Sequence, residues 1–83
     1  MELAFSPTAL RQLSRLERSV QQRIGRKLDF YIVQKQPLQF AEKLADAKAG
    51  EWRFRVGDYR VIFDVRENTI FVISVGHRKN IYR

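Results

Sequence analysis

The sequence predicts an α+β fold in which an N-terminal helical hairpin packs on a small antiparallel sheet. Apolar residues recur every three or four positions between residues 10 and 32, which is the period of amphipathic helices. From residue 51 onward apolar and polar residues alternate instead, which is the period of half-buried strands. A chain of 83 residues without repeats has room for one domain with a small core, and we assign residues 1–83 to it.

The first half of the chain is predicted to form a short strand and two helices. Residues 2–5 alternate polar and apolar, as in a short strand. Ser6 and Pro7 are a helix cap and a first helical residue, and leucines then recur at a spacing of three over about three turns. A second helix, with Ser19 as its candidate cap, ends before Pro37. Its apolar stripe comprises Val20, Ile24, Leu28, Tyr31 and Ile32.

The second half is predicted to form a meander of antiparallel strands. Phe40, Leu44 and the alanines around them predict a short third helix that ends near Gly50. Gly57-Asp58 is a glycine-first turn of the kind that closes a two-residue hairpin loop. The predicted order of elements is therefore β-α-α-(α)-β-β-β.

The predicted hairpin turn determines which side chains share a face of the sheet. It pairs Arg55 with Arg60 and Arg53 with Ile62, because residues directly opposite one another lie on the same side. The other face, toward the helices, carries Trp52, Phe54, Val56, Tyr59, Val61 and Phe63. Arg53, Arg55 and Arg60 form what we call the arginine patch, and none of these positions holds a balancing acid. Like charges directly opposite are unfavourable without a counter-anion, so the patch is predicted to bind a polyanion.

The last strand, residues 69–76, has two alternative registers. A three-residue loop near residues 67–69 places Arg78 on the face of the arginine patch, whereas a two-residue loop places His77 there. Gly76 is a candidate for a bulge that changes the register. The pattern favours the first register, in which the core receives Phe71, Ile73 and Val75.

The net charge of the chain indicates which class of macromolecule it binds. The chain has 16 Lys and Arg against 9 Asp and Glu, a net charge of +7. A small basic domain favours nucleic acid as a partner, then an acidic protein, then an anionic membrane surface. The arginines on the two helices are interpreted as solvated faces.

Several classes of protein are excluded by composition. The absence of cysteine excludes a disulfide scaffold and a thiol nucleophile, and a single histidine excludes a two-histidine metal site. No metal and no small-molecule cofactor are expected. No apolar run exceeds four residues and the N-terminus lacks the pattern of a signal peptide, which predicts a cytoplasmic protein with no membrane partner.

The C-terminal residues supply further candidates for chemistry. His77 carries the one side chain of the sequence that ordinarily titrates near neutral pH, so it is a candidate acid or base. Lys79 and Arg83 are candidates for phosphate contacts, and Tyr82 is a candidate for stacking on an unpaired base.

The sequence EWRFRVGDYRVIF at residues 51–63, with Val75-Gly76-His77-Arg78 and Tyr82, resembles the RelE/ParE superfamily of bacterial and archaeal toxins. The helical hairpin that opens with Ser6 and Pro7 fits the same family, so the resemblance covers almost the whole chain. It implies a microbial-RNase-like RelE fold. It also implies the toxin of a type II toxin–antitoxin pair, which is neutralised by a small cognate antitoxin protein.

The resemblance also implies a mechanism. In the RelE-like branch the toxin is an endoribonuclease that cleaves mRNA in the ribosomal A site, without metal, by attack of the 2′-hydroxyl. The positions of that branch are occupied here by Arg53, Arg55, Arg60, Arg78 and Tyr82. Arg60 and Arg78 are expected to stabilise charge, Arg53 and Arg55 to hold the RNA backbone, and Tyr82 to stack or transfer a proton.

The sequence departs from the family at the first two of these arginines, and two alternatives remain open. Well-studied interferases carry lysines at positions 53 and 55; arginine stays protonated, so a general base is not expected there. One alternative function is that of the ParE-like branch, which inhibits DNA gyrase. The other is a non-catalytic RNA-binding module.

Overall fold

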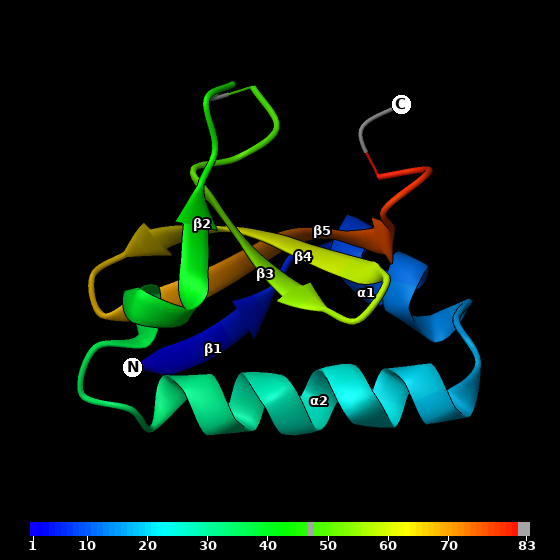
Figure 1. The fold of residues 1–83 in the computed structure, drawn as a ribbon, viewed down its shortest axis with the longest axis horizontal. Helices are drawn as coiled ribbons and strands as arrows, with labels where there is room; N and C mark the ends of the chain where they lie inside the picture. The colour runs from blue at the N-terminus through cyan, green and yellow to red at the C-terminus, as the bar shows by residue number, and fades with distance from the viewer. Residues whose placement is uncertain (47, 82–83) are drawn as a thin grey trace.

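The computed structural model describes residues 1–46 and 48–81 and shows two helices packed on a five-stranded sheet (Figure 1). The strand order is β1-β5-β4-β3-β2. The elements are β1 (Glu2–Phe5), α1 (Pro7–Ser14), α2 (Arg18–Ile32), the 3₁₀ helix η1 (Pro37–Phe40), β2 (Ala41–Lys43), β3 (Trp52–Val56), β4 (Tyr59–Arg66) and β5 (Thr69–His77). The predicted α+β class with an N-terminal helical hairpin is confirmed.

The sheet is mixed, whereas the sequence predicted an antiparallel one. β1 lies parallel to β5 at the edge of the sheet, with Ala4 opposite Phe71, and the other neighbouring strands are antiparallel. The alternation of residues 2–5 identifies a strand but carries no information about its partner. A parallel pair requires a long crossover connection, and the α1–α2 hairpin begins that connection.

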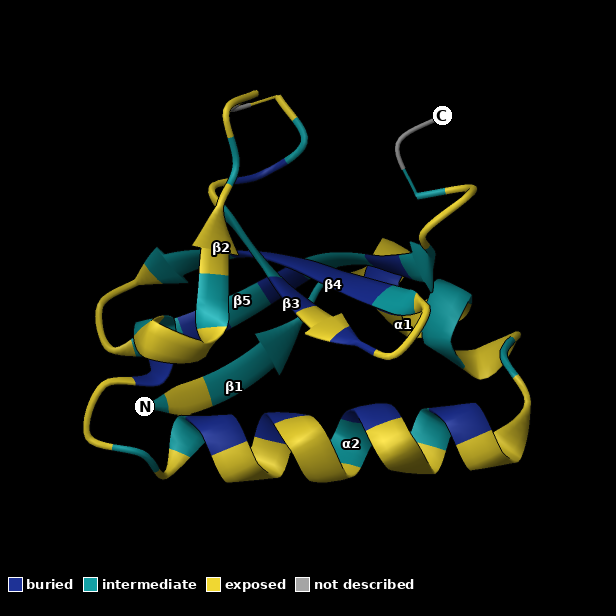
Figure 2. Ribbon diagram, in the orientation of Figure 1, coloured by how far each residue is buried: buried dark blue, intermediate teal, exposed yellow. Residues whose placement is uncertain are grey.

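The two helices begin with different kinds of residue. Ser6 caps α1 as predicted, because its side chain accepts a hydrogen bond from the Ala9 amide at 3.0 Å and Pro7 occupies the first turn. α2 begins at Arg18 after Glu17, so the prediction of Ser19 as its cap is wrong. Figure 2 shows the buried stripe of α2 turned toward the sheet and its exposed side turned away from it.

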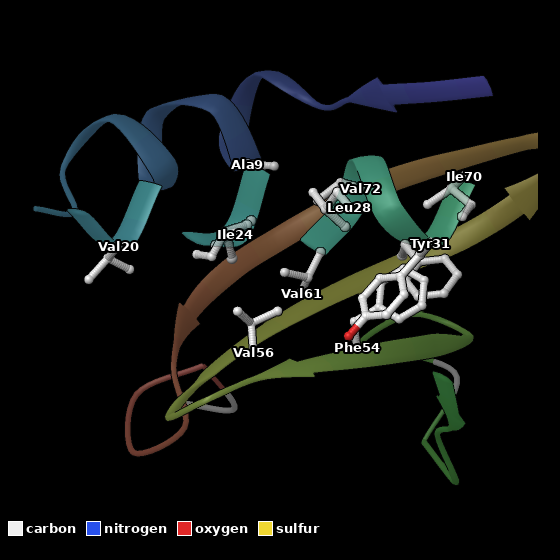
Figure 3. Packing of buried hydrophobic residues seen from close by; sticks show 12 residues of the cluster. Ala9, Val20, Ile24, Leu28, Tyr31, Phe54, Val56, Val61, Ile70 and Val72 are labelled. Atoms are coloured by element: carbon white, nitrogen blue, oxygen red, sulfur yellow. The ribbon is translucent and has the colours of Figure 1, made fainter. Parts of the chain in front are cut away.

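Aromatic rings join α2 to the centre of the sheet. Tyr31 stacks on Phe54 with ring centroids 4.3 Å apart (Figure 3). Phe54 in turn stacks on Phe63, with ring centroids 4.4 Å apart. Both phenylalanines are fully buried, and burial of such a side chain stabilises a fold by about 1.5–3 kcal/mol. This contact holds α2 on one face of β3 and β4 and leaves the opposite face for the arginine patch.

The predicted third helix near residues 40–50 is wrong. A turn of 3₁₀ helix, η1, is followed by strand β2, in which Ala41 and Lys43 pair with Phe54 and Trp52 of β3. Hydrogen bonding to a neighbouring strand has outweighed the helix propensity of the alanines. As a result Glu42 lies directly opposite Arg53.

β5 begins in the register that the sequence did not favour. Glu67 and Asn68 form a two-residue turn with φ angles of 45° and 54°. This turn directs Ile70 and Val72 into the core, in place of the predicted Phe71 and Ile73.

A bulge then shifts the second half of β5 by one residue. Ser74 pairs with Ile62 while Val72 pairs with Phe63, so Ile73 is the extra residue and Val75 enters the core as predicted. The side-chain oxygen of Gln12 on α1 accepts a hydrogen bond from the Val75 amide at 2.7 Å. The bulge therefore lies at Ile73 and not at the predicted Gly76.

Candidate functional site

The sheet register brings the arginine patch together as predicted. Arg55 pairs with Arg60, and Arg53 pairs with Ile62, across the β3–β4 hairpin. Gly57, at a φ of 59°, belongs to the two-residue turn that sets this register. The patch is therefore a consequence of a local turn.

Arg60 is the most constrained member of the patch. The residue is only 8% exposed, and its Nη1 atom donates hydrogen bonds to the Gly57 and Tyr59 carbonyls, each at 2.9 Å. Two carbonyl acceptors hold the guanidinium group in one orientation before any ligand binds. Preorganised donors of this kind stabilise developing negative charge most effectively.

A carboxylate that the sequence did not associate with the patch lies beside it. Glu42 of β2 approaches Arg55 Nε at 2.9 Å and Arg53 Nη2 at 3.3 Å. The prediction that the patch has no balancing acid is therefore wrong, because β2 supplies one. The hydrogen bond from Arg53, together with the charges of Arg53, Arg55 and Arg60, lowers the pKa of the Glu42 carboxyl below its ordinary value.

A hollow of about 410 Å³ adjoins the patch on the same side of the sheet. Its floor includes Ile62, which pairs with Arg53 and follows Arg60 by two positions on β4, so the three side chains share one face. One wall is the loop between β2 and β3, and Ile81 forms part of the opposite wall. Figure 1 shows this loop and the segment after β5 projecting away from α2.

The loop lies directly on the floor of the hollow at Gly50. A Cβ atom at this position would come within 2.5 Å of Ile62 Cγ2, and Gly50 has a φ of 137°, which side chains rarely adopt. Glycine is therefore required for the loop to approach the sheet this closely. The contact buries Ile62, which is 1% exposed although it points away from the helices.

Arg78, a predicted site residue that follows the arginine patch in sequence, lies at the β3–β4 turn. The Arg78 amide donates to the Asp58 carbonyl at 2.8 Å, and Arg78 Nε lies 3.6 Å from the Asp58 carboxylate. Arg78 and Arg60 thus both contact residues of this turn. Lys79 is exposed in the segment that follows.

His77 lies apart from the patch. It pairs with Tyr59, and the two rings meet edge to face at 5.4 Å, so His77 shares the face that Tyr59 occupies and not that of Arg60. Its Nδ1 atom accepts a hydrogen bond from the Lys79 amide at 3.1 Å. Tyr82 and Arg83 fall outside the described residues. The roles predicted for these two residues and for His77 stay predictions.

Within residues 1–46 and 48–81, no group of three or more acidic or histidine side chains is arranged to hold a metal ion. In the same residues, neither helix combines the length and the apolar character that crossing a bilayer requires.

Sequence reasoning missed Glu42 and the hollow for the same reason. Both depend on residues 41–50, where three strand residues are too few to show alternation. One signal was present: Gly50 precedes a basic strand, and a glycine there is consistent with a close approach of two backbones.

Known structures share this fold. A chain of the RelBE2 toxin–antitoxin complex from Mycobacterium tuberculosis superposes with a TM-score of 0.76, at 25% identity, over 93% of this chain and 96% of that one. A chain of the RelB–RelE complex from Methanococcus jannaschii gives 0.74, also at 25% identity, over 95% and 94%. For the Escherichia coli RelBE complex the TM-score is 0.62 at 22% identity, over 92% and 94%, a likeness of fold alone.

The fold and the arginine-lined face thus define a toxin of the RelE/ParE superfamily. Residues 3–82 match the family described as the ParE toxin of the type II toxin–antitoxin system parDE, and the chain belongs to this family. Comparison with curated protein sequences gave no significant match.

Proposed function

We propose that this type II toxin is an endoribonuclease that cleaves mRNA in the ribosomal A site and so inhibits translation in the cytoplasm. The observation that carries the proposal is the arginine patch beside a hollow large enough for a nucleobase. Guanidinium groups bind phosphate in a fixed, bidentate geometry. The hollow is lined by apolar side chains together with Asp46, Lys48 and Ser74, so it offers an unstacked base both contact area and hydrogen-bonding groups. The similarity, at 25% identity, to chains of two Rel-type toxin–antitoxin complexes supports a RelE-like toxin.

In the proposed reaction the RNA supplies its own nucleophile. The 2′-oxygen of a ribose attacks the adjacent phosphorus, which forms a P–O2′ bond and breaks the P–O5′ bond. The 2′-hydroxyl proton passes to a base, and the leaving 5′-oxygen receives a proton from an acid. The products are a 2′,3′-cyclic phosphate and a free 5′-hydroxyl.

The charges around the phosphate suit this reaction. Arg60, held by two carbonyls, is placed to stabilise the extra charge of the phosphorane, and Arg78 approaches from the same turn. Arg53 and Arg55 position the phosphate backbone.

Glu42 is the candidate proton acceptor that the arginines themselves do not provide. The neighbouring arginines lower the pKa of this carboxyl, which favours the ionised, proton-accepting form and at the same time weakens it as a base. Tyr82 remains the candidate acid, whereas His77 lies on the other face of the sheet from Arg60. The ribosome is expected to supply the geometry of the substrate, and the antitoxin to block the site.

Mapping of cleavage sites in a translation extract tests the proposal. Addition of the purified toxin is expected to produce new 5′ ends within codons of translated mRNA, detected by primer extension, and few cuts in naked RNA. Efficient degradation of naked RNA would contradict the dependence on ribosomes. An absence of new 5′ ends in translated mRNA would contradict endonuclease activity altogether.

The ParE description of the family favours one alternative, inhibition of DNA gyrase. A gyrase inhibitor would block supercoiling and trap cleaved DNA complexes while mRNA stays intact. A non-catalytic RNA-binding module would instead bind RNA in a salt-sensitive manner and produce no new ends.

Substitution of Glu42 by glutamine separates binding from chemistry. The variant Glu42→Gln is expected to lose about 10²–10⁴-fold in single-turnover cleavage, the usual contribution of positioned proton transfer. RNA binding should be retained or strengthened, because a carboxylate that competes with phosphate for Arg53 and Arg55 has been removed. Cleavage rates and filter-binding affinities measured on the same preparation check both parts.

Glu2→Gln, an exposed change on β1, is the matched control and is expected to behave as wild type. Wild-type cleavage by Glu42→Gln would exclude Glu42 as the base and leave it as a counter-ion only.

A further inference from the structure

The outer edge of β5 changes its neighbour midway along the strand. β1 pairs with β5 only as far as Phe5 opposite Val72, and the Ser6 amide donates one more bond to the Val72 carbonyl at 2.8 Å. Within the described part of the chain no strand continues along this edge, and α1 lies beside it instead (Figure 1). The backbone groups of the second half of β5 that point to this edge therefore need other partners.

Two side chains supply such partners at the bulge. Ser6 Oγ donates a hydrogen bond to the Ile73 carbonyl at 2.9 Å. Gln12 Oε1 accepts one from the Val75 amide at 2.7 Å and another from Ser74 Oγ at 3.1 Å. Because a backbone N–H can only donate, the oxygen of the Gln12 amide and not its nitrogen faces β5. Gln12 thus takes the place that a carbonyl of a neighbouring strand would occupy.

The bulge decides which residues at the end of β5 face the arginine patch. With the two-residue turn that opens β5 and no bulge, His77 would share the face of Arg60, as the alternative register predicted. The extra residue places Gly76 opposite Arg60 instead, and Arg78 follows two positions later. Arg78 therefore reaches the candidate site because the bulge is present.

The same shift brings Ser74 to the hollow. Ser74 pairs with Ile62 on the floor of the hollow and lines it, whereas Val75 enters the core. Without the bulge Ser74 would lie opposite Val61, and its hydroxyl would be buried in the core. The unbulged strand would in exchange complete the ladder with β4, so the two registers have opposing costs.

Gln12 distinguishes the bulged register from the unbulged one. In the unbulged strand Ser74 would take the place of Val75, and Ile73 that of Ser74. An amide would still face Gln12, but the isoleucine side chain beside it could not donate a hydrogen bond. The bond from the Ser74 hydroxyl therefore stabilises the bulged register alone.

We propose that Gln12 is a positioning residue of the candidate site: by holding the bulge it places Arg78 beside Arg60 and Ser74 in the hollow. The expected effect on rate rests on the proposed cleavage of RNA, whereas the expected effect on register rests on the structure alone. In this role Gln12 acts through β5 and needs no contact with the RNA.

Cleavage by variants of Gln12 tests the inference. Gln12→Met keeps the length and the helix propensity of the side chain but removes the amide oxygen, and single-turnover cleavage of translated mRNA is expected to fall about tenfold, as for loss of Arg78. Gln12→Glu keeps an oxygen acceptor and is expected to cleave at close to the wild-type rate. The double variant Gln12→Met/Arg78→Ala should be little slower than Arg78→Ala, because both changes act through one side chain. Gln22→Met, at an exposed position of α2, is the matched control.

The register itself is measured by NMR on the same proteins. The Tyr59 and His77 rings lie 5.4 Å apart, so nuclear Overhauser effects between them report the bulged register. These effects are expected to weaken in Gln12→Met and to persist in Gln12→Glu. Deletion of Ile73 in the Gln12→Met background makes Ser74 follow Val72 directly, which keeps the bulged parity without a bulge. This deletion is expected to restore both the ring contact and cleavage, which it would not do if Gln12 only stabilised α1.

Each other outcome has a defined meaning. A wild-type rate and an intact ring contact in Gln12→Met would overturn the inference and leave the proposed function standing. Slow cleavage with an intact ring contact, or a loss that the Ile73 deletion does not restore, would also overturn it. A wild-type protein that cleaves no mRNA would overturn the proposed function, and the ring contact would still decide the register. If Gln12→Met does not fold, a folded protein after the Ile73 deletion supports the inference and an unfolded one overturns it.

Discussion

Replacement of Arg60 by alanine is expected to reduce cleavage of translated mRNA by about 10²–10³-fold, the usual cost of removing one preorganised donor from a charged transition state. The guanidinium group of Arg60 is buried and oriented by the Gly57 and Tyr59 carbonyls. Arg60→Lys keeps the charge but replaces the planar guanidinium by a single ammonium group, so most of the loss is expected there as well. Single-turnover primer extension on stalled ribosomes measures the effect.

Two further variants make the result specific. Arg78→Ala changes an exposed side chain at the same turn and is expected to reduce cleavage by about tenfold with no change in folding. Arg66→Ala, at the far end of β4 where Arg66 pairs with Asp64 at 3.7 Å, is expected to cleave as wild type. Equal activity of Arg60→Ala and Arg66→Ala, with both proteins folded, would contradict the assignment of Arg60.

Replacement of Gly50 by alanine is expected to destabilise the fold by about 2–5 kcal/mol, from the strained φ and the overpacked contact together. The φ of 137° is unfavourable for any side chain, and the new Cβ would approach Ile62 Cγ2 to 2.5 Å. The loop must then move off the floor of the hollow, so RNA cleavage is expected to fall with stability. Urea unfolding at constant m-value measures the change.

Gly25 offers a matched control within the same chain. A Cβ atom at Gly25 meets nothing within 4 Å, and the residue lies inside α2. Gly25→Ala is therefore expected to stabilise the protein by about 0.5–1 kcal/mol, the difference in helix propensity between the two residues. A Gly50→Ala variant as stable as wild type would show that the loop does not need this close contact.

Short-range patterns were sufficient for much of the fold. Ser6 and Pro7 located the start of α1 because a helix cap depends on neighbouring residues only. The Gly57-Asp58 turn likewise predicted the pairing of Arg55 with Arg60, since a two-residue loop fixes the register of its own hairpin. The arginine patch follows from that register.

Predictions failed where the outcome depended on segments distant in sequence. The register of β5 changes at Ile73. Two positions later, the Val75 amide donates a hydrogen bond to the side-chain oxygen of Gln12 on α1. No pattern within residues 69–76 encodes that contact. The parallel pairing of β1 with β5 is of the same kind, because alternation identifies a strand and not its neighbour.

Some features of the candidate site could be predicted from the sequence, and others arise only from tertiary contacts. The order of residues along the chain was enough to predict a basic hairpin with three arginines on one face, because charge and alternation are properties of neighbouring residues. Tertiary contacts alone brought Glu42 to those arginines, placed Gly50 on Ile62 to form the hollow, and separated His77 from Arg60. These arrangements join elements far apart in the sequence, and their stability comes from packing and hydrogen bonds that no single segment contains.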